Sequence, residues 1–130
     1  MHELEYHTDI IKWNNLIQPV FNSIVNQRWK IVALIVSKKP IAIAANNLEK
    51  THPLIHQYNP HRRLHAEIRC IFKAPDRKLK NSTLYIWRKG ADDQFLLSKP
   101  CSMCMDFIIS AGIKKIVYST NSNSFKELRI

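Results

Sequence analysis

The stretches His65-Ala66-Glu67 and Pro100-Cys101-Ser102-Met103-Cys104 are the most informative part of this chain. Together they offer one imidazole, two thiols and one further carboxylate. Three ligands of this kind suit a catalytic zinc ion, which keeps a fourth coordination position for water, whereas a structural zinc ion is normally closed by four protein ligands. The two stretches therefore predict a catalytic Zn²⁺ site.

The P-C-x-x-C stretch is expected to begin a helix that runs from Cys101 to Ala111 and ends at Gly112 in a C-cap role. Because Cys101 and Cys104 are three positions apart, such a helix places both sulfurs on one face. Pro100 suits the start of a helix, and the positive end of the helix dipole favours thiolates there. Both cysteines are predicted zinc ligands.

The H-x-E stretch is expected to lie near the start of a second helix, from Arg62 to Lys73. On a regular helix His65 and Glu67 would point about 200° apart, so they are poorly placed to clasp one ion together. We therefore expect divided roles, with His65 as the third zinc ligand and Glu67 as the carrier of protons between water and substrate. General acid–base catalysis of this kind contributes roughly 10²–10⁴-fold.

The segments around the two motifs predict an α/β fold. Apolar positions from Asp9 to Gln27 recur at helical spacing, and Pro19 is expected to kink or split this helix. Residues 46–60 are expected to form a loop over the site, and residues 124–130 favour a short strand over a helical turn. Runs rich in β-branched residues predict strands at Lys30–Val36, Ile41–Ala45, Thr83–Arg88 and Lys115–Thr120. The expected result is an α/β sandwich with one sheet and both motif-bearing helices on the same face.

The composition is that of one globular domain. With 130 residues, 45% apolar and 23% charged, we expect a single domain over residues 1–130, made of an N-terminal helical segment (1–28), a catalytic core (31–120) and a short C-terminal strand or tail (121–130). No apolar run approaches the roughly 20 residues of a membrane span, and the N-terminus lacks a secretion signal. Three cysteines, two of them in C-x-x-C spacing, favour metal binding in a reducing compartment, so the expected location is the cytoplasm.

The charge of the chain points to phosphate-bearing partners. A net charge of +10 and a sequence pI of about 9.8 attract nucleotides, single-stranded nucleic acid or tRNA, and disfavour a cationic substrate. The basic residues nearest the motifs are the candidates for phosphate contact, although each taken alone reads as an ordinary surface charge: Lys50, Arg62, Arg63, Arg88 and Lys99.

The order H-A-E followed by P-C-S-M-C resembles the zinc signature of the cytidine/deoxycytidylate deaminase superfamily, which includes tRNA adenosine and polynucleotide cytidine deaminases. The similarity runs from about residue 31 to residue 120, and residues 47–53 and 98–101 resemble small deaminases common in phage and microbial genomes. The resemblance implies a cytidine-deaminase-like three-layer α/β/α sandwich with a mixed sheet of four to five strands, and a homo-oligomer. It implies zinc held by His65, Cys101 and Cys104, with Glu67 as proton shuttle.

The resemblance also suggests substrate contacts. An asparagine at the end of the second strand is implied to contact the sugar; Asn47 matches best, and Asn46 is the alternative. The backbone of Ala66 matches the position that meets the pyrimidine edge, and Ser98 and Pro100 are placed beside the substrate.

Two features depart from the pattern of many relatives. Ala44-Ala45 stands where a glycine usually precedes the sugar-binding asparagine, and only ten residues follow Thr120. The nucleotide and tRNA deaminase branch usually adds a parallel strand and helices there. A short antiparallel fifth strand is the expected ending here, which weakens any transfer of substrate identity.

Three functions remain open. The leading one is hydrolytic deamination of a cytosine-type base to uracil in a (deoxy)cytidine or (deoxy)cytidylate, with zinc-activated water as nucleophile. The alternative is a deaminase of polynucleotide, either single-stranded DNA cytosine or tRNA adenosine; its supports are the basic charge and aromatic residues able to stack on bases, namely Trp13, Trp29, Tyr58 and Trp87. Core packing is favoured for Trp13 and Trp29. A non-catalytic, zinc-stabilised nucleic-acid-binding module is the third, and the carboxylate of Glu67 argues against it.

Four other residues have chemistry-bearing side chains but weaker signals. Cys70 lies one turn beyond Glu67 on an apolar stripe and is predicted to be a buried core thiol. His52, His56 and His61 are interpreted as loop residues, any one of which could touch the substrate.

Overall fold

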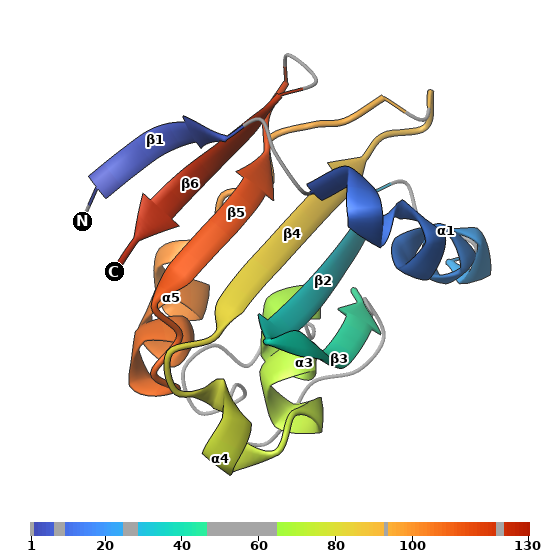
Figure 1. Cartoon of the computed structure of the whole chain (residues 1–130). Helices are drawn as coiled ribbons and strands as arrows, with labels where there is room; N and C mark the ends of the chain where they lie inside the picture. The colour runs from blue at the N-terminus through green and yellow to red at the C-terminus, as the bar shows by residue number, and fades with distance from the viewer. Residues whose placement is uncertain (1, 7–9, 25–28, 47–64, 93, 122–123) are drawn as a thin grey trace.

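A computed structural model of the chain describes residues 2–6, 10–24, 29–46, 65–92, 94–121 and 124–130. Its centre is a six-stranded sheet in the order β1-β6-β5-β4-β2-β3 (Figure 1). The strands are β1 (His2–Tyr6), β2 (Lys30–Ser37), β3 (Lys39–Ala45), β4 (Thr83–Lys89), β5 (Lys115–Ser119) and β6 (Phe125–Arg129). The five predicted strands are all present, and β1 adds a sixth that the expectation of four to five strands did not include.

The sheet is mixed, as predicted. The β4–β5 pair is parallel and every other neighbouring pair is antiparallel. A parallel pair needs a crossover connection, which α5 (Ser102–Ser110) provides between β4 and β5. β6 then returns antiparallel to β5, so the short antiparallel strand expected at the end of the chain is confirmed.

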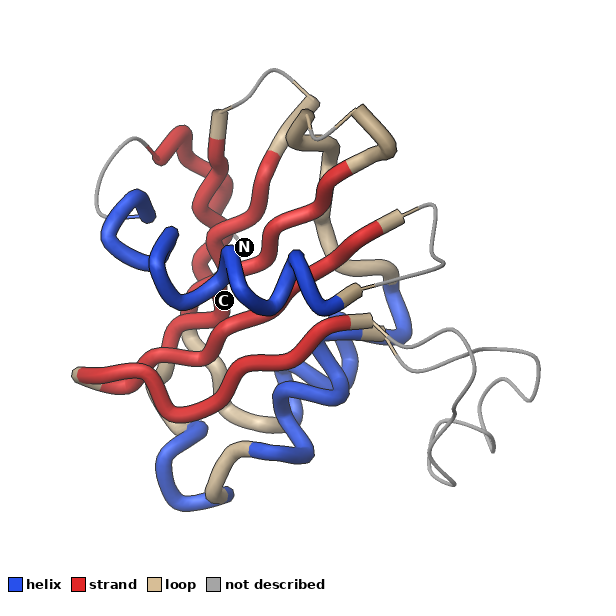
Figure 2. The backbone as a smooth tube through the Cα atoms, turned by 90° about the vertical axis from the view of Figure 1, so that its right-hand side faces the viewer, coloured by secondary structure: helices blue, strands red, loops and turns tan. Residues whose placement is uncertain are grey.

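Helices cover both faces of the sheet, which confirms the three-layer α/β/α sandwich. α3 (Ala66–Lys73) and α5 pack on one face, while α1 (Asn14–Ser23) packs on the other, preceded by the 3-10 turn η1 (Ile10–Trp13) (Figures 1 and 2). The short helix α4 (Asp76–Leu79) leads into β4. Both motif-bearing helices therefore lie on one face, as expected.

Successive side chains of a strand point to opposite faces of the sheet, so each face has its own hydrophobic core. Ala33 and Ile35 of β2 lie in the cluster beneath α3 and α5, whereas Val32 and Leu34 lie in the cluster beneath α1. All four side chains are buried. The continuous apolar run of β2 is thus explained by burial on both faces of the sheet.

The N-terminal region differs from the prediction in two ways. Residues 2–6, expected within a helical segment, form β1, because antiparallel pairing with β6 satisfies their backbone groups. Pro19 neither ends nor divides α1; the segment changes instead from 3-10 to α geometry between Trp13 and Asn14. Burial of Ile17 and Phe21 on either side of Pro19 offsets the one helical hydrogen bond that the proline cannot donate.

Glu127 is a buried acid that links the two last strands. It is 4% exposed, and its carboxylate lies 3.2 Å from Lys115 Nζ in β5 and 2.8 Å from Arg129 Nε in β6. Burial by itself would raise the pKa of Glu127, but the hydrogen bonds and charges of Arg129 and Lys115 outweigh it, so the pKa is lowered. The ion pair consequently stabilises the pairing of β5 with β6 only while Glu127 is ionised.

The packing of α1 predicts a large effect at Phe21, which is 2% exposed beneath that helix. Phe21→Ala should lower the free energy of unfolding by about 3–5 kcal/mol, because it leaves a cavity against the sheet. Leu16→Ala, on the exposed side of the same helix, should change it by less than about 0.5 kcal/mol. Urea denaturation of the three proteins measures the difference; equal effects would mean that α1 does not form the second core.

Glu127→Gln should lower the free energy of unfolding by about 1 kcal/mol at pH 7. The folded-state pKa of Glu127 lies below its unfolded value, so the wild-type advantage is complete above the unfolded pKa and declines as the pH falls through the folded pKa. Urea titrations at pH 7 and at pH 3 should therefore show the gap between the two proteins closing in acid. A gap that is constant with pH would assign the effect to packing alone.

Candidate metal centre

Two of the three predicted ligands, His65 and Cys101, each stand immediately before a helix. His65 precedes α3 and Cys101 precedes α5, and both have extended backbone torsions at the N-cap position. The backbone carbonyl oxygens of His65 and Cys101 accept the first helical hydrogen bonds, from Arg69 and Met105. Because α3 and α5 pack side by side, two helix N-termini with their partial positive charges meet at this point.

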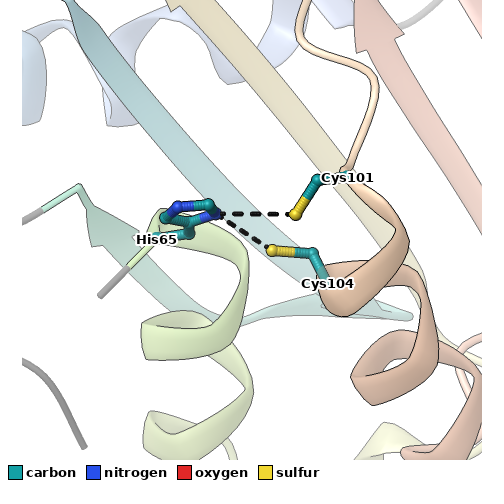
Figure 3. A group of neighbouring side chains, drawn as sticks. All are labelled: His65, Cys101 and Cys104. Carbon is teal, nitrogen blue, oxygen red and sulfur yellow. Dashed lines mark hydrogen bonds between the residues drawn. The ribbon is translucent and has the colours of Figure 1, made fainter. Parts of the chain in front are cut away.

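The three predicted ligand side chains point toward one another (Figure 3). His65 Nδ1 lies 3.2 Å from Cys104 Sγ and 3.9 Å from Cys101 Sγ, and all three ligand atoms lie within 4.8 Å of one another. Tetrahedral zinc with ordinary Zn–S and Zn–N bonds needs such atoms roughly 3.5–3.8 Å apart. Both His65–sulfur distances therefore differ from the required values by a few tenths of an ångström, and the three atoms lie close enough together to ligate one zinc ion.

The protonation states of the two cysteines favour binding of a metal cation. The hydrogen bond from the Cys104 thiol, helped by that to His65, lowers the pKa of Cys101 to about 3, so Cys101 is a thiolate at neutral pH. The same hydrogen bond and burial raise the pKa of Cys104. Cys104 is fully buried while Cys101 is exposed, so the open side of the ligand set is the side of Cys101. A metal ion binding here displaces the proton held by Cys104.

Glu67 lies in the first turn of α3, next to the ligands. It is 5% exposed, and its Oε1 atom is buried without a hydrogen-bond partner among the described residues. Burial raises the pKa of Glu67, while the backbone hydrogen bond, the charge of His65 and a hydrogen bond to Cys104 oppose the rise. His65 stands outside the helix with an extended backbone, so the 200° separation of a regular helix does not apply, and both residues face one cleft.

The cleft that contains the site has a volume of about 380 Å³, within the range of small-molecule pockets. It carries two cationic side chains and one carboxylate, and the start of β2 and the end of β4 each contribute one lining residue, Ile31 and Arg88. The lining residues are Trp29, Ile31, Asn46, His65, Glu67, Arg88, Leu97, Ser98, Lys99 and Cys101.

Asn46 lines this cleft, but its amide is engaged by the backbone. Its Oδ1 accepts a hydrogen bond from the Ile31 N–H (3.0 Å), and its Nδ2 donates to the Trp29 carbonyl (3.1 Å). Asn46 thus fastens the end of β3 to the start of β2. Asn47, the better match to the sugar-binding position, lies outside the described residues.

Ser98 also lines the cleft, and its hydroxyl is tied to the sheet. It donates to the carbonyl oxygen of Ile86 (3.0 Å) and accepts from the N–H of Ser119 (2.8 Å). These bonds hold the loop that leads to Cys101. Ala66 is fully buried and Pro100 is buried as well, so their side chains support the two motifs from within. Substrate contacts by these residues stay predictions.

The predictions about aromatic residues need correction. Trp87 is fully buried beneath α1 and stacks near Tyr85, so it cannot stack on a base. Trp13 packs edge-on against Tyr85, as expected. Trp29, for which core packing was favoured, is 38% exposed and lines the cleft. Tyr58 lies outside the described residues.

The outcome for the remaining candidates is mixed. Cys70 is confirmed as a buried thiol: it donates to the Ala42 carbonyl (3.3 Å), and burial raises its pKa to about 12. Among the basic candidates, Arg88 and Lys99 line the cleft. The other basic candidates and the three loop histidines lie outside the described residues: Lys50, Arg62, Arg63, His52, His56 and His61.

The site's geometry agrees with a comparison against protein families. A family described as the cytidine and deoxycytidylate deaminase zinc-binding region matches residues 18–120. The chain belongs to this family. No match to a curated protein was found. Within the described part of the chain, no helix combines the length and apolar character needed to cross a membrane.

Membership confirms the resemblance inferred from the two motifs and extends it into α1. It supports a zinc-dependent deaminase whose substrate is a nucleoside, a nucleotide or nucleic acid. Leu97 is a cleft residue that sequence reasoning missed, and Trp29 is one that it named as able to stack on a base but expected in the core. A signal for the position of Trp29 was present: it immediately precedes β2, which pairs with β3, and the candidate Asn46 directly follows β3.

The ligand set predicts a sharp difference between the cysteines. Cys104→Ser should weaken zinc binding by more than about 100-fold, since a lost ligand costs more than a lost outer-shell partner. Cys70→Ser should keep one zinc ion per chain, because its thiol bonds to backbone carbonyls away from the ligands. Metal analysis after dialysis against a competing chelator distinguishes them; equal zinc content in the two variants would rule out this ligand set.

Proposed function

We propose that the protein is a hydrolytic deaminase that converts a cytosine base to uracil in a (deoxy)cytidine or (deoxy)cytidylate substrate. The observation that carries the proposal is Glu67: a buried carboxylate whose Oε1 has no hydrogen-bond partner among the described residues, in the cleft beside three converging metal ligands. An unpaired buried polar atom is costly unless a function requires it. A purely structural zinc site has no use for such a group.

The reaction adds water to the base and releases ammonia. Zinc held by His65, Cys101 and Cys104 would supply Lewis-acid activation of water near neutral pH. Glu67 takes the proton that water loses as its oxygen bonds to C4 of the ring, and passes it to N3. Glu67 then takes the proton of the new hydroxyl group on C4 and gives it to the exocyclic amine; the bond between C4 and that amine breaks, C4=O forms, and ammonia leaves. Water and cytosine are thereby converted to uracil and ammonia.

Burial of the carboxylate serves this role. Only 5% of Glu67 is exposed, so bulk water cannot compete for its proton while substrate fills the cleft. The first turn of α3 holds the carboxylate near the ligands, which removes the need to order a mobile side chain during the reaction.

A deaminase of polynucleotide is the second candidate, favoured by the basic and aromatic residues that line the cleft. Arg88 and Lys99 line the cleft, and the exposed Trp29 lies beside them. Cations together with an aromatic ring are the features by which proteins bind single strands. A strand would be retained with a steep dependence on salt, whereas a free nucleotide would not.

The test is a substrate panel with a matched carboxylate control. Zinc-loaded wild type should release ammonia from at least one of cytidine, deoxycytidine and their mono- and triphosphates, measured with a coupled ammonia assay. Glu67→Gln should lower kcat by roughly 10²–10⁴-fold with its zinc content unchanged. Glu127→Gln, which also neutralises a buried glutamate but lies in β6, outside the cleft lining, should keep wild-type kcat below its melting temperature.

Two results would count against the proposal. One is the absence of turnover in zinc-loaded wild type on every member of the panel; turnover of cytosine within a single strand alone would favour the second candidate instead. The other is full activity of Glu67→Gln, particularly if Cys104→Ser fails to fold, because the metal would then be structural.

A further inference from the structure

One positively charged side chain of the cleft, that of Arg88, lies on the face of the sheet that carries the candidate metal ligands. Arg88 stands near the end of β4, directly opposite Ile31 of β2. Side chains alternate along a strand, and Leu84 and Ile86 pack beneath α3 and α5. Arg88 is the next residue in that series, so its side chain follows the same face to the point where the two helices begin. It lines the cleft together with Glu67.

Two contacts orient the guanidinium group. Its central carbon lies 4.9 Å from the centroid of the Trp29 ring, and Nη1 donates a hydrogen bond to the Leu97 carbonyl (3.3 Å). Nε is buried and has no hydrogen-bond partner among the described residues. A guanidinium has five N–H donors in a fixed fork, and the bond to Leu97 uses one of them. The guanidinium group of Arg88 is therefore held in position, and it keeps N–H donors for a ligand.

The neighbouring lysine shows that this placement is specific to position 88. Lys89 points to the opposite face of the sheet, where its ammonium lies 4.7 Å from the Phe21 ring and 5.4 Å from the Phe95 ring. It is 8% exposed and belongs to the core beneath α1. Of these two adjacent cations, only Arg88 faces the cleft.

The charges of the cleft favour an anionic ligand. Arg88 and Lys99 contribute two positive charges and Glu67 contributes one negative charge. Zinc balanced by two thiolates adds no net charge, so an excess of one positive charge remains. A guanidinium fork matches the oxygens of a phosphate group in two parallel hydrogen bonds.

We propose that Arg88, positioned by Trp29, anchors a phosphate group of the substrate, so that a phosphorylated cytosine nucleotide is preferred over the free nucleoside. The inference rests on the proposed function for the identity of the base, but not for the phosphate. The phosphate has two possible sources, the 5′-phosphate of a free nucleotide or a phosphodiester of a single strand.

The test compares binding with and without the phosphate, using zinc-loaded protein and titration calorimetry. Wild type should bind deoxycytidine 5′-monophosphate, or a short single-stranded DNA containing one cytosine, at least tenfold more tightly than deoxycytidine. Arg88→Gln should weaken binding of that phosphate-bearing ligand by about 10- to 100-fold and change the nucleoside affinity by less than threefold. Arg88→Lys, which keeps the charge without the fork, should fall between them.

Lys114→Gln is the matched control, because it removes one exposed cation immediately before β5, outside the cleft lining. It should leave all three affinities unchanged. The same variants assayed for ammonia should show the loss in kcat/KM for the phosphorylated substrate and not for the nucleoside. Whichever phosphate-bearing ligand loses affinity in Arg88→Gln identifies the source of the phosphate.

Equal affinity of wild type for phosphorylated and unphosphorylated ligands would overturn the inference, as would an Arg88→Gln protein that retains the preference. Arg88-dependent binding of the monophosphate without any release of ammonia would keep the phosphate site and reject the proposed deamination. Release of ammonia from the nucleoside and the monophosphate at equal rates would support the proposed deamination and reject the phosphate site. Zinc content and melting temperature of each variant confirm that the compared proteins are folded.

Discussion

The meeting of two helix N-termini on one face of the sheet is the constraint on which the rest of this structure depends. His65 and Cys101 occupy equivalent positions, each just before the first helical residue, and Cys104 follows one turn later. Backbone N–H groups at these ends favour negative charge, so the fold itself prepares thiolates for a cation. The sheet brings the two ends together because α3 follows β3, α5 follows β4, and both helices pack side by side into the core on one face of the sheet.

This arrangement also explains the division of work in the cleft. The polar side chains of Asn46 and Ser98 bond mainly to the backbone and hold the chain entering and leaving the strands. Glu67 and Arg88 instead have buried polar atoms without partners among the described residues. Groups of the first kind stabilise the shape of the site, and those of the second kind are available to a ligand.

The sequence predicted the metal ligands and most of the layers because those features rest on local patterns. C-x-x-C spacing, β-branched runs and the Gly112 helix end, which has a φ of 86°, need no knowledge of distant residues. β1 was missed although residues 2–6 alternate polar and apolar, because a five-residue strand is stable only through its pairing with β6, at the other end of the chain. Trp29 and Trp87 were misplaced because composition alone does not tell which face a strand residue takes, or that Trp29 stands just outside β2.

The hydroxyl pair of Ser98 and Ser119 has a consequence for how this part of the protein can change. After β4 the chain folds back in a turn around residues 91–92, pairs again at Phe95, and is then fixed to β5 by Ser98 before reaching Cys101. The hydrogen bonds between Ser98 and Ser119 of β5 thus fix the chain at a point between this turn and the thiols of Cys101 and Cys104. Insertions or deletions in the turn would change only the segment that precedes Ser98. The turn can therefore acquire new contacts during evolution while the candidate metal ligands keep their geometry.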